Sequence, residues 1–179
     1  MGMKINIFRL LRQDLVRLSE DYEQKTASVQ YWKIIHPRFF PVILIRLSHF
    51  FYQSVWLRPL SHILVWVNLI IFGIEVTPRC SIGGGLFLPH TSGTVIGAAS
   101  IGSNVTIFQG VTIGTRYADL FFNASNRPII EDGVMLGAGS KVLGGIIVGA
   151  GASVASNSLV IDSVPAGATV IGVPASIKV

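Results

Sequence analysis

A six-residue spacing of aliphatic side chains runs through the second half of this 179-residue chain and limits what it can fold into. The positions that share this step are Ile82 and Leu88, then Ile101, Ile107 and Ile113, and finally Ile130, Leu136, Val142, Val148, Val154 and Val160. An α-helix repeats about every 3.6 residues and a strand alternates every two, so neither produces a period of six. Hexapeptide repetition of this kind predicts a parallel β-helix.

The geometry of such a coil explains the residue types. Each hexad supplies one short strand and one turn, so three hexads close a triangular coil and stacked coils share a continuous core. The aliphatic residue points into the prism, and the residue four positions later lies near a corner, where slim side chains fit. These later positions hold Val134, Ser140, Ile146, Ala152, Ser158 and Val164. The pattern therefore assigns residues 74–179 to the β-helix.

Two interruptions of the period are informative. Seventeen residues lead from Ile113 to Ile130, where a multiple of six is expected, so residues 115–128, including Leu120, are predicted to leave the coil as a loop. A second irregularity lies within residues 91–100. Loops extruded from a rigid scaffold commonly carry function.

Residues 1–73 follow a helical period instead. Apolar side chains recur at three- and four-residue steps, with polar side chains such as Asp14 on other faces, which predicts an amphipathic helix. The apolar positions are Ile5, Phe8, Leu11, Leu15 and Leu18. Two further apolar stretches follow at Phe39–Trp56 and Leu60–Phe72, and each opens near a proline, which favours helix starts.

The composition requires more burial than one small core provides. Hydrophobic residues make up 50% of the chain and charged residues 13%, with a mean hydropathy of +0.60, whereas soluble proteins carry about 25% charged residues. Residues 1–60 hold nine basic and four acidic residues, so 9 − 4 = +5 accounts for the whole formal net charge of +5. A basic, apolar segment suits an anionic membrane surface better than nucleic acid, which needs a denser basic patch.

The apolar stretches do not read as independent membrane spans, which need about 20 mostly apolar residues. Arg46 interrupts the first stretch and Asn68 the second. We expect interfacial helices or a shallow hairpin, with a helical bundle buried inside an oligomer as the alternative. Cys80 is the only cysteine, and the first twenty residues lack the apolar core of a signal peptide. The expected location is cytoplasmic, with peripheral contact to the inner face of the membrane.

Five segments of the β-helical half follow one another in a specific order. They are Gly73-Ile-Glu-Val-Thr-Pro78, Ile82-Gly-Gly-Gly-Leu-Phe-Leu-Pro-His90, Ile101-Gly-Ser-Asn-Val-Thr-Ile-Phe-Gln-Gly-Val-Thr-Ile-Gly114, Leu136-Gly-Ala-Gly-Ser-Lys-Val-Leu-Gly144 and Val164-Pro-Ala-Gly-Ala-Thr-Val-Ile-Gly-Val-Pro-Ala175. In these segments the chain resembles the serine acetyltransferase family of hexapeptide acyltransferases. The resemblance implies a left-handed parallel β-helix, a homotrimer, and acetyl-CoA as co-substrate in the groove between adjacent subunits. The N-terminal helices are closer in style to the branch that acetylates exopolysaccharide or capsule precursors.

Acetylation of a hydroxyl needs a base that takes the proton of the attacking oxygen, and histidine, with a pKa near 6.5, suits this role at neutral pH. His90 is the only histidine in residues 74–179 and stands where the family places its catalytic histidine. A carboxylate usually orients such a base. Glu75, fifteen residues earlier and thus about one coil away, is the candidate, at a position where the family has Asp.

The acceptor site departs from the family pattern. Pro89 stands where the family has an acidic residue, and Asn126-Arg127-Pro128 replaces its Arg-His-Pro segment, so a saccharide precursor is the predicted acceptor. Arg127 would bind a carboxylate or phosphate group on it. The alternative acceptor is L-serine.

By the same resemblance, small side chains and two lysines would hold acetyl-CoA. The predicted cofactor-binding residues are Gln109, Gly114, Ala138, Lys141, Ser156, Pro174 and Lys178. A zinc site of the type found in other prism enzymes needs about three histidine ligands, so the single His90 argues against a metal. A non-catalytic trimeric scaffold is the alternative from another class.

Overall fold

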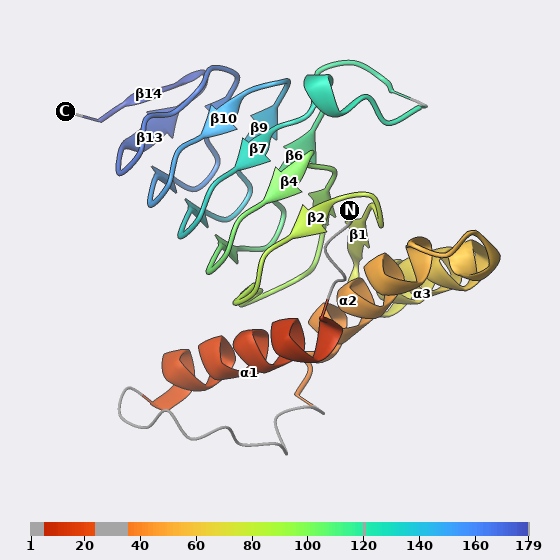
Figure 1. Ribbon diagram of the computed structural model, residues 1–179. Helices are drawn as coiled ribbons and strands as arrows, with labels where there is room; N and C mark the ends of the chain where they lie inside the picture. The colour runs from red at the N-terminus through yellow and green to blue at the C-terminus, as the bar shows by residue number, and fades with distance from the viewer. Residues whose placement is uncertain (1–5, 24–35, 120, 179) are drawn as a thin grey trace.

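The structure is a computed structural model that describes residues 6–23, 36–119 and 121–178. Helices come first and a parallel β-helix follows, with Gly73 between them in a left-handed conformation that ends the last helix. Figure 1 shows the helices gathered at the end of the prism where the first coil lies. Ile5 and Leu120, which entered the sequence predictions, lie outside the described residues. The division of the chain into two domains remains a prediction.

The helical segment contains the apolar helices that the sequence predicts. Its described helices are α1 (Ile7–Glu23), α2 (Phe40–Tyr52) and α3 (Arg58–Phe72), with the short 3-10 turn η2 (Val55–Leu57) between α2 and α3. Another 3-10 turn, η3 (Ala124–Asn126), lies in the loop of residues 115–128. Pro41 and Pro59 lie in the first turns of α2 and α3, where the missing amide hydrogen costs nothing. The two helices pack side by side as a hairpin with its turn away from the prism (Figure 1).

In the part of the chain that the structure describes, the strands form three sheets, one for each face of the prism, and all strand pairs except the most C-terminal one are parallel. Sheet A contains β1 (Ile74–Val76), β3 (Thr94–Ile96), β6 (Thr112–Gly114), β9 (Lys141–Leu143) and β12 (Leu159–Val160). Sheet B contains β2 (Ser81–Ile82), β4 (Ser100–Ile101), β7 (Ile129–Ile130) and β10 (Ile147–Val148). Sheet C contains β5 (Thr106–Ile107), β8 (Met135–Leu136), β11 (Ser153–Val154), β13 (Thr169–Gly172) and the antiparallel β14 (Ala175–Ile177).

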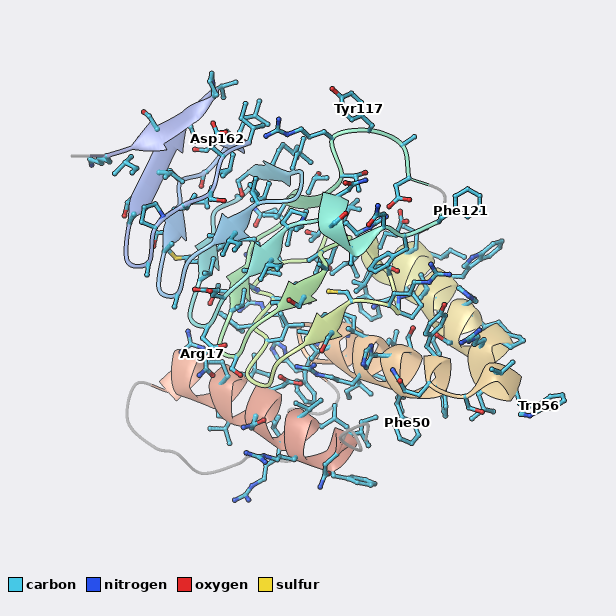
Figure 2. All side chains as sticks on the ribbon, turned by 45° about the horizontal axis from the view of Figure 1, so that its top comes forward. Arg17, Phe50, Trp56, Tyr117, Phe121 and Asp162 are labelled. Atoms are coloured by element: carbon cyan, nitrogen blue, oxygen red, sulfur yellow. The ribbon has the colours of Figure 1, made fainter. Side chains whose placement is uncertain are left out.

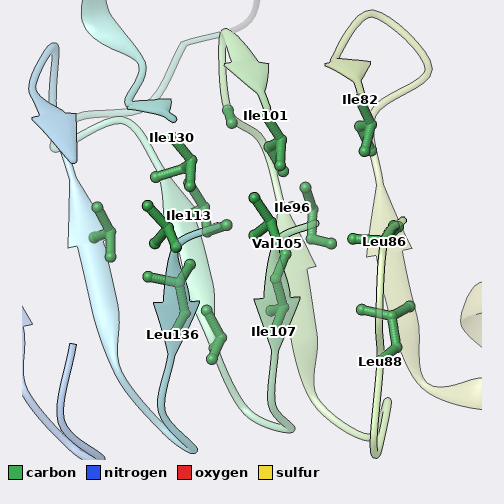
Figure 3. Packing of buried hydrophobic residues seen from close by; sticks show 14 of the residues in the cluster. Ile82, Leu86, Leu88, Ile96, Ile101, Val105, Ile107, Ile113, Ile130 and Leu136 are labelled. Carbon is green, nitrogen blue, oxygen red and sulfur yellow. The ribbon is translucent and has the colours of Figure 1, made fainter. Parts of the chain in front are cut away.

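The strand register confirms the hexapeptide interpretation. In the coil that follows the extruded loop, Ile130 pairs with Val148, Leu136 with Val154 and Val142 with Val160, an offset of eighteen residues on each face, which is three hexads per coil. All the aliphatic positions of the repeat are buried, and they line the inside of the prism as a continuous column (Figure 3). The left-handed parallel β-helix with an N-terminal helical segment is therefore the fold of this chain.

The two irregularities have distinct structural causes. Ile96 takes the inward position of β3, eight residues after Leu88 and five before Ile101, so the corner before β3 is two residues longer than usual. This corner contains His90. Ile113 pairs with Val142 at an offset of 29 residues rather than 18, because residues 115–128 leave the coil between β6 and β7.

A buried ion pair fastens the helices to the first coil. The Arg46 guanidinium on α2 donates to both carboxylate oxygens of Asp14 on α1, at 2.8 and 2.9 Å. It also donates to the carbonyl oxygens of Ile82 and Gly83, while Asp14 accepts the backbone N–H of Leu86 at 2.9 Å. Asp14 and Arg46 are both almost fully buried, so water does not solvate either charge and each charge is stabilised by the other.

The amphipathic pattern of α1 is only partly right. Leu15 and Leu18 are buried, but Phe8 is 82% exposed and does not belong to the packed face. Asp14, predicted on a polar face, is 1% exposed. The helical period predicts a solvent-facing position for a carboxylate because the side chain is polar. Here the burial of Asp14 is compensated by hydrogen bonds from Arg46 and from the backbone N–H of Leu86.

Candidate active site

One edge of the prism, where sheet C meets sheet A, carries His90. The Thr91 hydroxyl donates to the carbonyl oxygen of Phe72 at 2.8 Å, and the Gly93 N–H donates to that of Gly73 at 2.9 Å. The extended corner therefore lies against the start of β1. The imidazole of His90 is exposed there.

A ladder of backbone hydrogen bonds continues this edge along the prism. Its steps are Gly110 N to Ser92 O (3.0 Å), Gly139 N to Gln109 O (2.9 Å) and Asn157 N to Ala138 O (2.8 Å). The predicted cofactor-binding residues Gln109, Ala138 and Ser156 thus lie on one edge that starts at His90. Small side chains along it leave the backbone accessible to an extended ligand.

Two further groups near this edge have unusual hydrogen bonding. The Oε1 atom of Gln109 is shielded from solvent and has no partner among the described residues. Lys141 is the first residue of β9 on sheet A, next to this edge. Its Nζ atom donates to the carbonyl oxygen of Gly110 at 2.6 Å. The ammonium group therefore lies beside the edge rather than extended into solvent.

The remaining predicted cofactor residues lie elsewhere. Gly114 ends β6 at the opposite side of sheet A, where its carbonyl oxygen accepts the N–H of Gly144 at 2.9 Å. Pro174 and Lys178 belong to the C-terminal hairpin of β13 and β14 on sheet C, and both are exposed. A single chain does not gather these three residues with the His90 edge.

The outer side of sheet A holds a pocket of about 400 Å³ between the helices and the extruded loop, here called the sheet A pocket. Its charged and aromatic lining residues are Tyr52, His62, Glu75, Arg79, Asp119, Phe122 and Arg127. Glu75 points outward from the middle of β1, at the register position of Val95. Three predicted site residues, Glu75, Gly114 and Arg127, therefore line one cavity.

Arg127 is held firmly in the wall of this pocket. Its Nη1 atom donates to the carbonyl oxygen of Gly97 at 2.8 Å, and its Nη2 atom to Asp119 at 3.2 Å. The guanidinium lies 4.2 Å from the ring centre of Phe122. Burial opposes ionisation of Asp119, but the N–H groups of Asn123 and Phe121 and the charge of Arg127 together hold its pKa below the usual range.

Other predicted site residues are separated from the sheet A pocket. Pro89 is buried, and Asn126 lines a different groove beneath the loop, beside Tyr117. Neither His90 nor Pro89 lines the sheet A pocket, and no hydrogen bond within the described residues joins His90 to Glu75. The described contacts of one chain therefore do not join the proposed base to its proposed orienting carboxylate.

His62 is a pocket residue that the sequence analysis did not identify. It lies on α3, yet it lines the sheet A pocket and meets the ring of Tyr52 edge-on at 6.0 Å. The β-helix motifs carry no signal for it, because only the docking of α3 brings it there. His49 is fixed on the carbonyl oxygen of Pro78, and its burial is the main reason that its pKa is lowered.

The only thiol is unsuited to nucleophilic chemistry. Cys80 is buried, and this burial raises its pKa to about 12, against the opposing effect of nearby Arg127 and Arg46. The thiolate, which is the reactive form, is therefore scarce at neutral pH. Cys80 is therefore a poor candidate for a covalent nucleophile at neutral pH.

A prism of hexapeptide coils with a histidine and small residues along one edge defines a hexapeptide-repeat acyltransferase. Residues 127–162 match the family model described as "Bacterial transferase hexapeptide (six repeats)". The serine acetyltransferase of Bacillus subtilis is 33% identical over 175 residues, which cover 96% of this chain and 77% of that protein.

Solved structures agree with the sequence relatives. The serine acetyltransferase of Neisseria gonorrhoeae superposes with a TM-score of 0.83 at 31% identity, over 97% of this chain and 65% of that one. A serine acetyltransferase in complex with CoA superposes with a TM-score of 0.81 at 30% identity, over 96% of this chain and 69% of that one.

The chain belongs to the serine acetyltransferase family. Members of this family are acetyl-CoA-dependent O-acyltransferases, and we assign this enzyme class, with acetyl-CoA as acyl donor, to the chain. The comparisons favour L-serine over the saccharide that the sequence analysis preferred as acceptor, because the relatives are serine acetyltransferases.

Proposed function

We propose that the chain acetylates the hydroxyl of L-serine. His90 takes the hydroxyl proton as the oxygen attacks the thioester carbonyl of acetyl-CoA; the new C–O bond forms, the C–S bond breaks, and the proton passes to the departing CoA thiolate. The observation that carries the acceptor is the relationship to serine acetyltransferases across 96% of the chain. Glu75 would orient His90, and the edge of Gln109, Ala138 and Ser156 would bind the donor.

The active site is completed by a second subunit of a homotrimer. Gly114, Pro174 and Lys178 lie away from the edge that starts at His90, and His90 does not line the pocket that contains Glu75 and Arg127. A groove between two prisms would bring such separate surfaces together, with acetyl-CoA between them.

A saccharide acceptor is the alternative within the same chemistry. Pro89 offers no carboxylate beside His90, and Arg127 already binds Asp119 and the carbonyl oxygen of Gly97. A neutral hydroxyl-bearing acceptor would not need either residue.

The test is CoA release from acetyl-CoA by the full chain, with L-serine and a panel of saccharides offered in parallel. Turnover with L-serine alone is the expected result. Turnover with a saccharide alone would replace the proposed acceptor. No binding of acetyl-CoA in a calorimetric titration would contradict the enzyme class and favour a non-catalytic trimeric scaffold.

The surface of α3 has the reverse of the usual amphipathic arrangement. Its buried residues are Ser61 and Asn68, which bond to α2: Ser61 Oγ donates to the carbonyl oxygen of Ser48 at 2.7 Å, and Asn68 to that of Pro41 at 3.2 Å. Large apolar side chains point outward instead, and they are Leu60, Ile63, Trp66, Leu69, Ile70 and Ile71 on α3, together with Val55, Trp56 and Leu57 on the preceding turn η2. Trp56 projects from the hairpin turn (Figure 2). Small polar contacts between helices with apolar outer faces are typical of helices in lipid.

The α2–α3 hairpin would place the enzyme at an anionic membrane surface of the cytoplasm. By length and composition alone, Val55–Phe72 is apolar enough to cross a bilayer, and only 11% of it is buried. Its partner helix α2, however, is tied to the prism by the buried Arg46, and α3 runs directly into β1. A hairpin whose two ends are held at the prism can dip into one leaflet with its tip, and the basic N-terminal segment complements anionic headgroups.

Replacing Trp56 and Trp66 with serine is expected to weaken binding to vesicles that contain phosphatidylglycerol about tenfold or more, since each large apolar side chain contributes about 1.5–3 kcal/mol on full burial. Co-sedimentation measures the bound fraction. The control is Tyr117→Ser, which removes an equally exposed aromatic ring from the distant loop (Figure 2). If the full-length protein does not co-sediment with the vesicles and is an oligomer in buffer without detergent, other subunits rather than lipid cover this face.

A further inference from the structure

Arg79 connects the helical hairpin to the extruded loop across the mouth of the sheet A pocket. It lies in the turn after β1, where its Nε atom donates to the hydroxyl of Tyr52 at 2.8 Å and its Nη1 atom to the carbonyl oxygen of Phe121 at 3.0 Å. Its guanidinium also lies 5.6 Å from the ring centre of Phe122, which Arg127 contacts as well. The sequence motifs described above do not predict a role for Arg79.

The charged side chains of the pocket are only partly paired with one another. Arg127 is paired with Asp119 at 3.2 Å. Glu75 lines the same pocket but forms no ion pair with Arg79. Arg79 remains, and both of its hydrogen-bond partners, a phenol and a backbone carbonyl, are neutral. Among the described residues, no carboxylate lies within salt-bridge distance of Arg79. Arg79 is therefore the guanidinium of this pocket that has no anionic partner among the described residues, and the carboxylate of a ligand can take that place.

We propose that Arg79 binds the carboxylate of the acceptor, a conclusion that rests on the proposed function. A guanidinium has five N–H donors, and the two bonds that Arg79 makes leave three of them available for a carboxylate. Arg127 is the less suitable group, because its Nη1 and Nη2 atoms already bind Gly97 and Asp119, and its Nε atom is shielded from solvent. Arg127 shapes the wall, and Arg79 recognises the charge.

The test compares L-serine with L-serinamide, in which a neutral amide replaces the carboxylate. In Arg79→Gln we expect the KM for L-serine to rise about 10- to 100-fold, because a hydrogen bond to a charged group is lost. The kcat, the KM for acetyl-CoA and the kcat/KM for L-serinamide are expected to stay within about twofold of wild type. The matched control is Arg58→Gln, because the Arg58 guanidinium also lies near Tyr52, 4.9 Å from the ring centre, but does not line the pocket.

Several outcomes would overturn this assignment. An equal rise of KM for L-serine and L-serinamide would mean that Arg79 only holds the loop in place. A loss of kcat with unchanged KM, or an effect of Arg58→Gln as large as that of Arg79→Gln, would have the same consequence.

Failure of the proposed function is distinguishable, because wild-type protein would then release no CoA with L-serine. In that case, both ligands are titrated calorimetrically into wild type and Arg79→Gln. Preference for L-serine that disappears in the variant would support the carboxylate site, and equal or absent binding of the two ligands would overturn it.

Discussion

Replacing His90 with asparagine is expected to lower the kcat for CoA release about 10²- to 10⁴-fold, the usual contribution of a positioned general base. The amide keeps a polar side chain on the exposed corner before β3, so the coil geometry and the binding edge should persist. The KM for acetyl-CoA is therefore expected to change little. Thiol detection of released CoA, at saturating acceptor, measures this effect.

His62 provides the decisive control, because it is the other histidine near the proposed chemistry. It lines the sheet A pocket together with Glu75, whereas His90 does not line it within one chain. His62→Asn is expected to reduce kcat less than about tenfold. If His62→Asn abolishes turnover while His90→Asn remains active, the base is on α3 and the assignment of His90 is wrong.

Replacing Arg46 with methionine is expected to destabilise the protein by about 3–5 kcal/mol, because it leaves the charge of Asp14 buried without its partner. The carbonyl oxygens of Ile82 and Gly83 would lose their donors as well. Urea unfolding followed by circular dichroism, at one fixed protein concentration, measures the change, since subunit association also contributes to stability.

Two further variants separate the ion pair from a general loss of charge. Arg12→Met removes an exposed arginine from α1 and is expected to change the unfolding free energy by less than about 0.5 kcal/mol. The double variant Asp14→Leu with Arg46→Met should recover part of the loss, because no buried charge remains. An Arg46→Met protein as stable as Arg12→Met would contradict a structural role for the pair.

The candidate site was predictable where the residues follow the β-helix repeat. His90, Gln109, Ala138 and Ser156 stand at fixed intervals from inward-facing aliphatic residues, so a regular coil places them on one edge. Glu75 could be placed on β1 for the same reason. Arg79 and His62 could not, because their contribution depends on how the loop and α3 fold onto sheet A, for which the repeat carries no signal.

The sequence by itself determined the prism, its three-hexad coils and the position of the extruded loop, because a six-residue aliphatic period has only one way to bury every member. It also determined the family, through motifs whose order follows the coils. The tertiary structure decided the environment of the charged residues: Asp14 and Arg46 are buried against each other, and Arg127 is held by Asp119 and Gly97. Polarity along a chain indicates which groups need partners, but only folding brings a partner from a distant segment within hydrogen-bonding distance.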